Sequence, residues 1–360
     1  MESSEEANNR TLISSSTSFL AAFHSDAVPL IVHCLSTVAL EVDETMGTIH
    51  DLLVARGKQA ALDAGINRPI VEAAAQYLSD EDSALSFAYS GWAQCALPHK
   101  RLAPDAPWSI TSEKVRLMVE PGRRLIGEDG SQDYEFVGVP FGAHARLILL
   151  FLQTEALRTG SREIELGGSL RQWLNRIGVS VGGMTGRSVR DQAERISRCR
   201  LTFQITTSGN RAVGLVNQSI VDRALFIDEG YGNQGRLNLE TAKLSEGFFE
   251  QLQKHPVPVE EAAIKALNNN APALDVYLWL AYRLHSLSGD RLVTWKALKG
   301  QFGAGFKEMY HFKPRFTGAL ALAQAVYPAA KLDLTEQGVV LRPSRPPVAP
   351  KGNAIRCFSA

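Results

Sequence analysis

Four arginines stand close together near the middle of the chain, and their side chains are suited to contact nucleic acid. They are Arg187, Arg190, Arg195 and Arg198. The planar guanidinium of arginine hydrogen-bonds in pairs to guanine edges and to phosphates. In a helix that turns about 100° per residue, Val189, Ala193 and Ile196 form an apolar stripe and the arginines lie away from it. The spacing therefore predicts a helix over 187–198 that presents arginines to DNA.

Two carboxylates leave a second interpretation of this helix open. Asp191 and Glu194 share the arginine face, so the helix could be a solvated one with internal ion pairs. A short capped helix and a Gly-rich turn precede it, and a hairpin-like sequence follows. That setting favours DNA contact over a merely solvated surface.

A second basic cluster lies in residues 291–315, where Glu308 is the one acid after Asp290. Its candidate DNA contacts are Lys296, Lys299, Lys307, Lys313 and Arg315. Aromatic residues interleave with them, but Phe316 and Leu320 begin an apolar stripe at helical spacing, so most of the rings are expected in the core. Because proline disfavours a helix interior, the basic helix of this cluster is expected to begin at Pro314.

No pattern in the chain points to catalysis. Residues 178–186 lack the Gly-Lys-Ser/Thr ending of a phosphate-binding loop. The histidines form no His-x-x-x-His pair, and there is no Gly-x-Ser-x-Gly elbow. The four cysteines share no metal-type spacing and are expected to be free thiols of a reducing cytoplasm. We therefore expect no enzyme activity, no catalytic residue, no metal and no cofactor.

The charge of the chain is unevenly distributed, although its sum is zero. Residues 1–100 hold 5 Lys/Arg and 13 Asp/Glu, whereas residues 141–224 hold 12 Arg and 6 acids. Since charges act locally within a Debye length of about 10 Å, the zero sum does not exclude DNA as a partner. The apolar stretch Val28–Leu40 is shorter than the ~20 residues of a membrane span, so no membrane partner is expected.

The elements that position the basic helices occur twice. Ser169–Gly178 and Thr294–Gly303 lie 125 positions apart, and each opens with a hydroxyl residue and ends in glycine. These are residues suited to cap a helix at its two ends. A long apolar helix, 141–157 or 272–287, precedes each segment, and a basic segment follows it. The sequence therefore predicts a duplicated unit.

Short β segments complete the expected units. Runs 201–206 and 212–220 are typical of a hairpin, which would be the wing of a winged helix, and Gly-rich residues 228–235 resemble a linker. We predict an α+β, mostly helical fold with two tandem winged-helix domains. The predicted parts are an acidic, partly disordered extension (1–65), a first winged-helix domain for dimerisation and DNA contact (66–228), a second for DNA recognition (236–345) and a Pro-rich tail (346–360).

Ordered strings of residues between about Leu97 and Val348 carry a resemblance to a known family. In the first half they are Val137-Gly-Val-Pro-Phe-Gly-Ala-His-Ala-Arg-Leu147, Gln153-Thr-Glu-Ala-Leu-Arg158, Ile164-Glu-Leu-Gly167 and Ser188-Val-Arg-Asp-Gln192. In the second half they are His255-Pro-Val-Pro258, Leu274-Asp-Val-Tyr-Leu-Trp-Leu-Ala-Tyr-Arg-Leu284, Gln301-Phe-Gly303 and Pro343-Ser-Arg-Pro346. With these strings the chain resembles the RepA-type plasmid replication initiators, the RepA C-terminal family.

The resemblance implies a protein of the bacterial cytoplasm that binds directly repeated double-stranded sites (iterons) at a plasmid origin. It implies homodimers that repress their own gene, in equilibrium with monomers that open the origin under plasmid copy control. It also implies recruitment of the host initiator ATPase and the replicative helicase. By position, the helix 187–198 and the segment 307–325 would contact DNA.

Two other functions stay open on the residues alone. A winged-helix transcriptional regulator would carry the same basic helices and have no role in replication. A nicking enzyme or primase would need carboxylates or histidines that hold a metal, and the sequence offers no such set.

Overall fold

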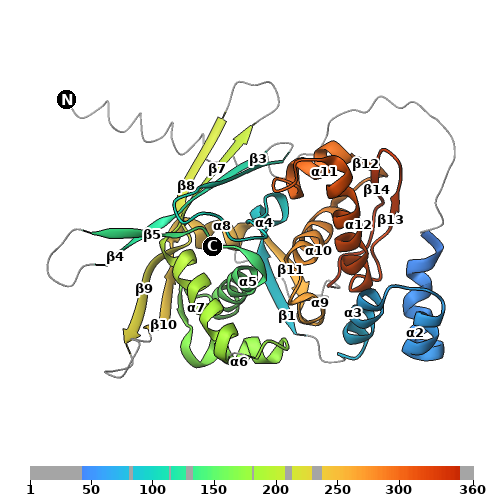
Figure 1. The fold of residues 1–360 in the computed structure, drawn as a ribbon, viewed down its shortest axis with the longest axis horizontal. Coiled ribbons are helices and arrows are strands. Elements are labelled where there is room, and N and C mark those ends of the chain that lie inside the picture. Colours follow the sequence, from blue (N-terminus) through green and yellow to red (C-terminus); the bar gives the residue numbers. More distant parts are fainter. Residues whose placement is uncertain are drawn as a thin grey trace.

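Two buried helices, α5 (Gly142–Thr159) and α10 (Ala271–Arg283), lie at the centre of the molecule (Figure 1). Most side chains along both are buried, because helices that are apolar on nearly every face belong in a core. α5 ends at Gly160, whose φ of 67° is a left-handed conformation that glycine adopts without strain. The side chain of Asn270 caps the first turn of α10, and Pro272 lies inside that turn.

The computed structural model describes part of the chain. The described residues are 43–80, 84–112, 115–126, 133–180, 182–206, 213–228 and 237–348. Within them, helices combine with several small antiparallel sheets. The predicted α+β class is therefore confirmed.

Each central helix opens a unit, and the two units share an order of elements, apart from two strands inserted into the first. After α5, the first unit continues with β6 (Glu163–Glu165), α6 (Gly167–Arg176) and α7 (Gly183–Arg198). The two inserted strands, residues 200–206 and 213–219, follow and join another sheet, and β9 (Val221–Asp228) and β10 (Leu237–Leu244) complete the unit. After α10 and the 3-10 turn η1 (Leu284–Ser286), the second continues with β12 (Arg291–Thr294), α11 (Trp295–Phe302), α12 (Met309–Ala325), β13 (Leu332–Leu334) and β14 (Gly338–Leu341). The strand orders are β6-β10-β9 and β12-β14-β13, so the last strand of each unit lies in the middle. The duplication that the twin segments predict is present in the fold.

The twin segments form α6 and α11, with one difference at their starts. Thr294 caps α11 as predicted, because its side chain accepts a hydrogen bond of 3.3 Å from the backbone of Ala297. α6 begins at Gly167, two residues before Ser169, so Ser169 is not the cap that its residue type indicates. Trp173 and Leu298 are buried, as expected for helices that support the helices after them.

The hairpin expected to be the wing exists, but it belongs to another sheet. That sheet consists of β2 (Trp108–Thr111), β3 (Val115–Glu120), β7 (Arg200–Thr206) and β8 (Val213–Ser219). Leu117 of β3 lies opposite Phe203 of β7, and both side chains are buried. The apolar alternation of these two strands joins them across a long sequence separation. β9 and β10 take the position in the first unit that was expected for the hairpin.

The predicted linker at 228–235 falls between two strands, β9 and β10, that pair with each other. Leu237 pairs with Asp228 and Leu244 with Val221, so the segment between the two strands joins neighbours of one sheet. Residues 229–236 themselves lie outside the described residues, and the predicted domain limits stay predictions.

The remaining elements connect the two units and flank them. They are α2 (Asp43–Asp63), α3 (Arg68–Leu78), β1 (Leu85–Tyr89), α4 (Ser90–Gln94), β4 (Gly122–Leu125), β5 (Tyr134–Gly138), α8 (Glu246–Lys254), β11 (Pro256–Glu260) and α9 (Glu261–Leu267). β1 pairs antiparallel with β11, and α3 packs against both α9 and α12. Residues 43–63 of the predicted extension thus form a helix that is kinked at Gly57, where φ is 76°, and residues 1–42 lie outside the described part.

Ionic contacts tie the first unit to α9 and to α10 of the second unit. Arg176 of α6 donates from Nε and Nη2 to Glu261 of α9, at 2.8 Å each, and Trp173 Nε1 donates to the same carboxylate at 3.1 Å. Arg146 of α5 pairs with Asp275 of α10 in the interior. Since paired and fully hydrogen-bonded charges fix a geometry, the two units are held in one defined arrangement.

Aromatic side chains fill the core of the second unit. The ring centroid of Phe302 lies 5.5 Å from that of Trp279 and 5.3 Å from that of Phe316. Phe312 is buried as well, whereas Tyr310 is 66% exposed. The prediction that most aromatics of the second basic cluster are core residues is confirmed.

Candidate nucleic-acid interface

α7 carries the first basic cluster, and its apolar stripe is the predicted one. The helix begins at Gly183, four residues before the predicted start, and ends at Arg198 as predicted. Val189, Ala193 and Ile196 are buried. α7 packs against α5 and against β4, β5, β9 and β10, so two sheets and a helix together fix its orientation.

His144 of α5 fixes the N-terminal half of α7. Its Nδ1 lies 2.8 Å from the hydroxyl oxygen of Ser188. Burial lowers the pKa of His144, so the ring is neutral at physiological pH. This contact therefore positions the helix without adding charge to the interface.

Arg187 and Arg190 are the arginines of α7 that remain available to a ligand. Arg187 is exposed and Arg190 is half-buried. Within the described part of the chain, neither guanidinium has an ion pair or a hydrogen-bond partner. Met184, one turn before Arg187, is 82% exposed, so the N-terminal turns of α7 project from the surface.

Arg195 is a structural residue, and its prediction as a surface contact needs correction. It is 2% exposed. Its Nε donates to Asp191 at 2.9 Å, its Nη1 donates to the carbonyl of Val139 at 3.2 Å, and its guanidinium lies 5.2 Å from the ring centre of Phe141. The turn between β5 and α5 covers the face of α7 that helical periodicity predicts to be exposed. Arg195 thus holds α7 to that turn.

Arg198 lies at the edge of the surface and is partly engaged. Its Nε donates to Glu194 at 3.1 Å, and its Nη1 donates to the carbonyl oxygen of Arg123 at 3.0 Å. The alternative interpretation of an internally paired helix therefore holds for the C-terminal turns of α7. It does not hold for Arg187 and Arg190.

Two further arginines lie beside α7 and were not predicted. Arg123 and Arg124 of β4 are exposed, and Arg124 Nη1 lies 3.1 Å from Glu194. The guanidinium of Arg123 lies over two rings of β5 at 4.4 and 4.5 Å. The pair of arginines in Gly122–Leu125 is visible in the sequence, but its position next to α7 depends on tertiary packing.

The predicted residues of the second unit divide into engaged and available ones. Lys299 Nζ donates to the carbonyl of Lys307 at 3.0 Å, and Lys313 Nζ lies 5.2 Å from the ring centre of Trp295. The side chains of Lys296, Lys307 and Arg315 are exposed. No described residue pairs with these three side chains, so they can bind phosphates or base edges.

Pro314 lies inside α12 and does not begin it, which corrects the expected start of the basic helix. The helix runs from Met309 to Ala325. Proline lacks the N–H that would bond to the carbonyl four residues earlier, that of Tyr310. Lys307 precedes the helix by two residues and Arg315 lies within it. Both belong to the same N-terminal end of α12.

Within the residues that the structure describes, neither a metal-type cluster nor a reactive thiol is found. No three of their His, Cys, Asp and Glu side chains gather as a metal site would require. Burial raises the pKa of the Cys95 thiol to about 11 and that of Cys199 to about 12, so both stay protonated near neutrality. In the same part of the chain, no helix is both long and apolar enough to cross a membrane.

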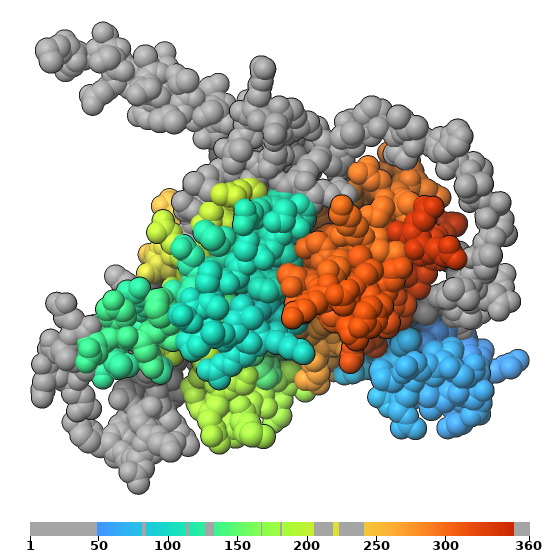
Figure 2. Space-filling view, turned by 45° about the horizontal axis from the view of Figure 1, so that its top comes forward, coloured from blue at the N-terminus to red at the C-terminus, as the bar shows by residue number. Residues whose placement is uncertain are grey.

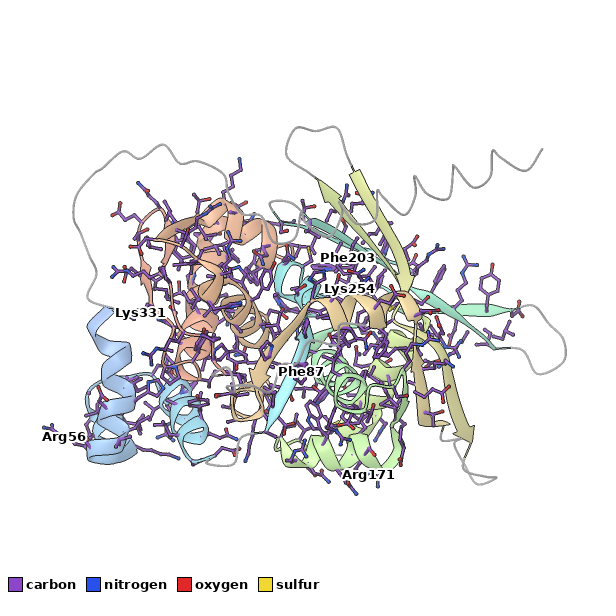
Figure 3. The ribbon with its side chains drawn as sticks, turned by 180° about the vertical axis from the view of Figure 1, so that it is seen from behind. Arg56, Phe87, Arg171, Phe203, Lys254 and Lys331 are labelled. Atoms are coloured by element: carbon purple, nitrogen blue, oxygen red, sulfur yellow. The ribbon has the colours of Figure 1, made fainter. Side chains whose placement is uncertain are left out.

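Figure 3 shows basic side chains on other faces as well. Arg171 lies on the outer side of α6, and Lys254 lies at the end of α8. Lys331 precedes β13. These three residues are therefore not part of the basic groups at the ends of α7 and α12.

Comparison with known proteins agrees with the resemblance seen in the sequence. Residues 139–296 match the model of a family described as plasmid encoded RepA protein. No curated protein matches the chain. A crystal structure of domains 2 and 3 of RctB aligns with a TM-score of 0.47 at 12% identity and covers 72% of this chain and 99% of that one. A second structure of RctB domains 2–3 aligns with a TM-score of 0.42 at 14% identity and covers 70% and 94%. The resemblance to RepA-type proteins is thereby confirmed over residues 139–296.

Proposed function

We propose that the chain is a plasmid replication initiator that binds repeated double-stranded sites at its origin. The observation that carries this proposal is the repeated unit: each copy holds a helix whose N-terminal end bears unpartnered basic side chains, Arg187 in α7 and Arg315 in α12. The match of residues 139–296 to plasmid encoded RepA proteins supports the role in replication.

In this proposal each unit is a winged helix. Both copies have a helix, a strand, two helices and a pair of strands, with the last strand central, and the first copy has β7 and β8 inserted before its strand pair. The third helix, α7 or α12, would enter the major groove, and the preceding helix would cross the backbone. Arg187 and Arg315 would read base edges. Lys296, Arg190 and Arg198 would hold phosphates, which position the protein without specifying sequence.

The arrangement of the two units supports binding to one continuous site. Arg146–Asp275 fixes α5 to α10, and Arg176–Glu261 fixes α6 to the neighbouring α9, so two helices would meet DNA at a set separation. Linked modules gain affinity because the second contact forms within the same complex. Repeated sites of one orientation would suit such a rigid pair.

The cellular roles in the proposal rest on the family resemblance. They are repression of its own gene by a homodimer, origin opening by the monomer, copy control, and recruitment of the host initiator ATPase and replicative helicase in the bacterial cytoplasm. We propose that the protein acts without catalysis and without a cofactor.

A mobility-shift assay on the DNA flanking the gene tests the proposal. The protein should bind direct repeats more tightly than random duplex of equal length, and its affinity should fall steeply as salt rises, because counterions leave the DNA on binding. Equal affinity for both duplexes would refute sequence-specific binding. Maintenance of an origin-bearing plasmid by protein supplied in trans then distinguishes an initiator from a winged-helix transcriptional regulator, which would bind its operator without maintaining the plasmid.

A further inference from the structure

A groove of about 1110 Å³ lies between the second basic cluster and the segments that precede the first unit. One wall is formed by Lys307 and by the face of α12 that runs from His311 to Leu322. The other walls are the segment 96–110 and the start of α3, with Asn67 and Ile70. In Figure 2 the surface around residue 100 (teal) lies directly beside the surface around residue 300 (orange).

The charged side chains that line this groove are all basic. Lys100, Lys307 and Arg315 are exposed, and His99 and His311 accompany them. No aspartate or glutamate is among the lining residues. Asp275, which contacts His99 at 2.8 Å, is paired with Arg146, and the exposed Glu308 next to Lys307 does not line the groove. The field in the groove therefore favours an anionic occupant.

The floor of the groove is apolar. Ile70, Leu102, Trp108, Phe306 and Leu322 line it and are half-buried. An apolar floor with a basic rim matches a chain segment that carries apolar and acidic side chains together. The groove is concave, whereas a helix that reads duplex DNA must project into a major groove about 12 Å wide. Duplex DNA is therefore a poor occupant of this space as it stands.

The first 42 residues of the chain have the composition that this groove would accept. They contain the acids Glu2, Glu5, Glu6, Asp26 and Glu41 and the single cation Arg10. They also contain the apolar stretch Val28–Leu40, and no Lys or Arg occurs between Arg10 and Arg56. The segment thus combines carboxylates with apolar side chains, as the rim and the floor require.

The segment also enters the described structure within reach of the groove. It ends where α2 begins, at Asp43, and His50 Nε2 of α2 lies 2.9 Å from the carbonyl of Ala325, at the far end of α12. From Ala325 to His311 the helix is about 21 Å long at 1.5 Å per residue. An extended chain covers that distance with fewer than about ten residues.

We propose that the groove between α12, α3 and the segment 96–110 is the docking site of the chain's own N-terminal segment, residues 1–42. Bound there, its carboxylates pair with Lys100, Lys307 and Arg315. This docking holds two predicted DNA contacts of the second unit away from DNA. The docking itself is independent of the proposed function, whereas its effect on DNA binding rests on that function.

Zero-length carbodiimide cross-linking of the full-length protein, followed by peptide mass spectrometry, tests the docking. Glu2, Glu5, Glu6, Asp26 and Glu41 should link to Lys100 and Lys307 far more often than to the exposed control lysines Lys254 and Lys331, which do not line the groove. The ion pair Lys265–Asp80, with 3.1 Å between its atoms, is an internal positive control. Groove links no more frequent than control links, with the Lys265–Asp80 link present, would overturn the proposal.

Two further experiments test whether the docking occurs within one chain and whether it affects DNA binding. In a mixture of protein with natural and heavy nitrogen, links must join peptides of equal isotope, because mixed pairs would assign the groove to the segment of a second copy and overturn docking within one chain. Replacing the five N-terminal acids by their amides removes the charges that pair with the groove and should tighten DNA binding about 3- to 10-fold at low salt. Unchanged DNA binding in this variant would contradict the proposed effect of docking on DNA binding. A protein that shows the groove links but no specific DNA binding would leave the docking intact and refute the proposed function.

Discussion

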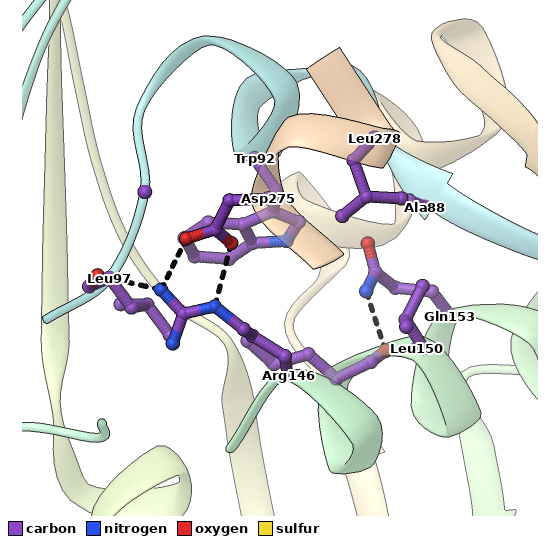
Figure 4. A pocket seen from close by; sticks show the side chains of 10 residues that line it. Ala88, Trp92, Leu97, Arg146, Leu150, Gln153, Asp275 and Leu278 are labelled. Atoms are coloured by element: carbon purple, nitrogen blue, oxygen red, sulfur yellow. Dashed lines mark hydrogen bonds and ion pairs between the residues drawn. The ribbon is translucent and has the colours of Figure 1, made fainter. Parts of the chain in front are cut away.

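The guanidinium of Arg146 donates two hydrogen bonds of 2.6 Å to the carboxylate of Asp275, from α5 of one unit to α10 of the other (Figure 4). Both side chains are 4% exposed. The remaining donors of Arg146 reach the carbonyls of Leu97, Pro98 and Gly142 at 2.7, 3.3 and 2.8 Å. The buried pair is therefore fully hydrogen-bonded, and it fixes the units relative to each other.

Breaking this pair should destabilise the protein strongly. Arg146→Met leaves a buried carboxylate without its cation, which costs about 3–5 kcal/mol. The double variant Arg146→Met with Asp275→Leu removes both charges and should recover most of that loss. Urea unfolding of the two single variants and the double variant measures the coupling. Additive losses in this cycle would mean that the pair contributes no interaction of its own.

The same pair should make stability depend on acid pH. Burial alone would raise the pKa of the Asp275 carboxyl, but Arg146 and His99 beside it hold that pKa below its ordinary value of 3.8. The stabilisation is then fully present above the unfolded-state value and is lost as the pH falls through the folded-state value. Asp275→Asn should flatten this acid branch when urea midpoints are compared from neutral pH to about pH 3. An unchanged acid branch in the variant would assign the effect to other carboxylates.

Arg187 and Arg195 should respond in opposite ways to the same substitution. Arg187→Ala removes an exposed, unpartnered side chain, so it should weaken binding to origin repeats by about 1–3 kcal/mol and leave the melting temperature unchanged. Arg195→Ala leaves the buried carbonyl of Val139 without its donor and removes the ion pair with Asp191, so it should lower the free energy of unfolding. Mobility shifts and thermal melts of the two variants separate the roles. The assignment fails if Arg195→Ala is fully stable and Arg187→Ala binds as tightly as the parent.

Local pattern was enough to predict the repeat and the apolar stripes. The twin segments became α6 and α11, and Val189, Ala193 and Ile196 lie on the buried side of α7. Periodicity reports which face of a helix meets a core, because that depends on the helix alone. The helical character of α12 and the burial of Phe316 follow from the same kind of information.

What the sequence could not supply depends on contacts between distant segments. Arg195 looked exposed because nothing in its own helix indicates that the turn at Val139 and Phe141 covers it. The strands β7 and β8 have the pattern of a hairpin, but only their pairing with β3 decides which sheet they join. The groove in front of α12 combines residues near 100, 67 and 311, so no local window contains it.

Arg315 should contribute to DNA binding in a way that a distant cation does not. Arg315→Ala removes an exposed guanidinium of α12 and should weaken specific binding by about 1–3 kcal/mol if it reads a base. Lys331→Ala, which removes an exposed cation outside the groove, is the matched control and should change affinity only slightly. Fluorescence anisotropy with a repeat-containing duplex at two salt concentrations measures both variants. Equal losses of affinity in the two variants would mean that Arg315 contributes only general electrostatic attraction to DNA.

The effects of substitutions at Gly138 and at Arg195 on stability should be coupled. Its φ of 83° is strained for any L side chain, and an added Cβ would lie 2.2 Å from Nη1 of Arg195. Gly160, with a φ of 67° and open space around it, is the matched control. Gly160→Ala carries the backbone strain alone, about 1–2 kcal/mol. Gly138→Ala should cost more, because Arg195 is held by Asp191 and Val139 and cannot move aside freely.

Gly138→Ala should lower the free energy of unfolding by less when Arg195 has already been replaced by alanine. In Gly138→Ala with Arg195→Ala, the added methyl meets no guanidinium, so the two losses should sum to more than the loss of the double variant. Urea unfolding of the parent, both single variants and the double variant gives this coupling. Strict additivity would mean that Gly138 is required for its backbone conformation alone. The coupling energy could instead equal the extra loss of stability of Gly138→Ala over Gly160→Ala. Glycine would then be required at position 138 because the buried side chain of Arg195 occupies the space that a methyl group would fill.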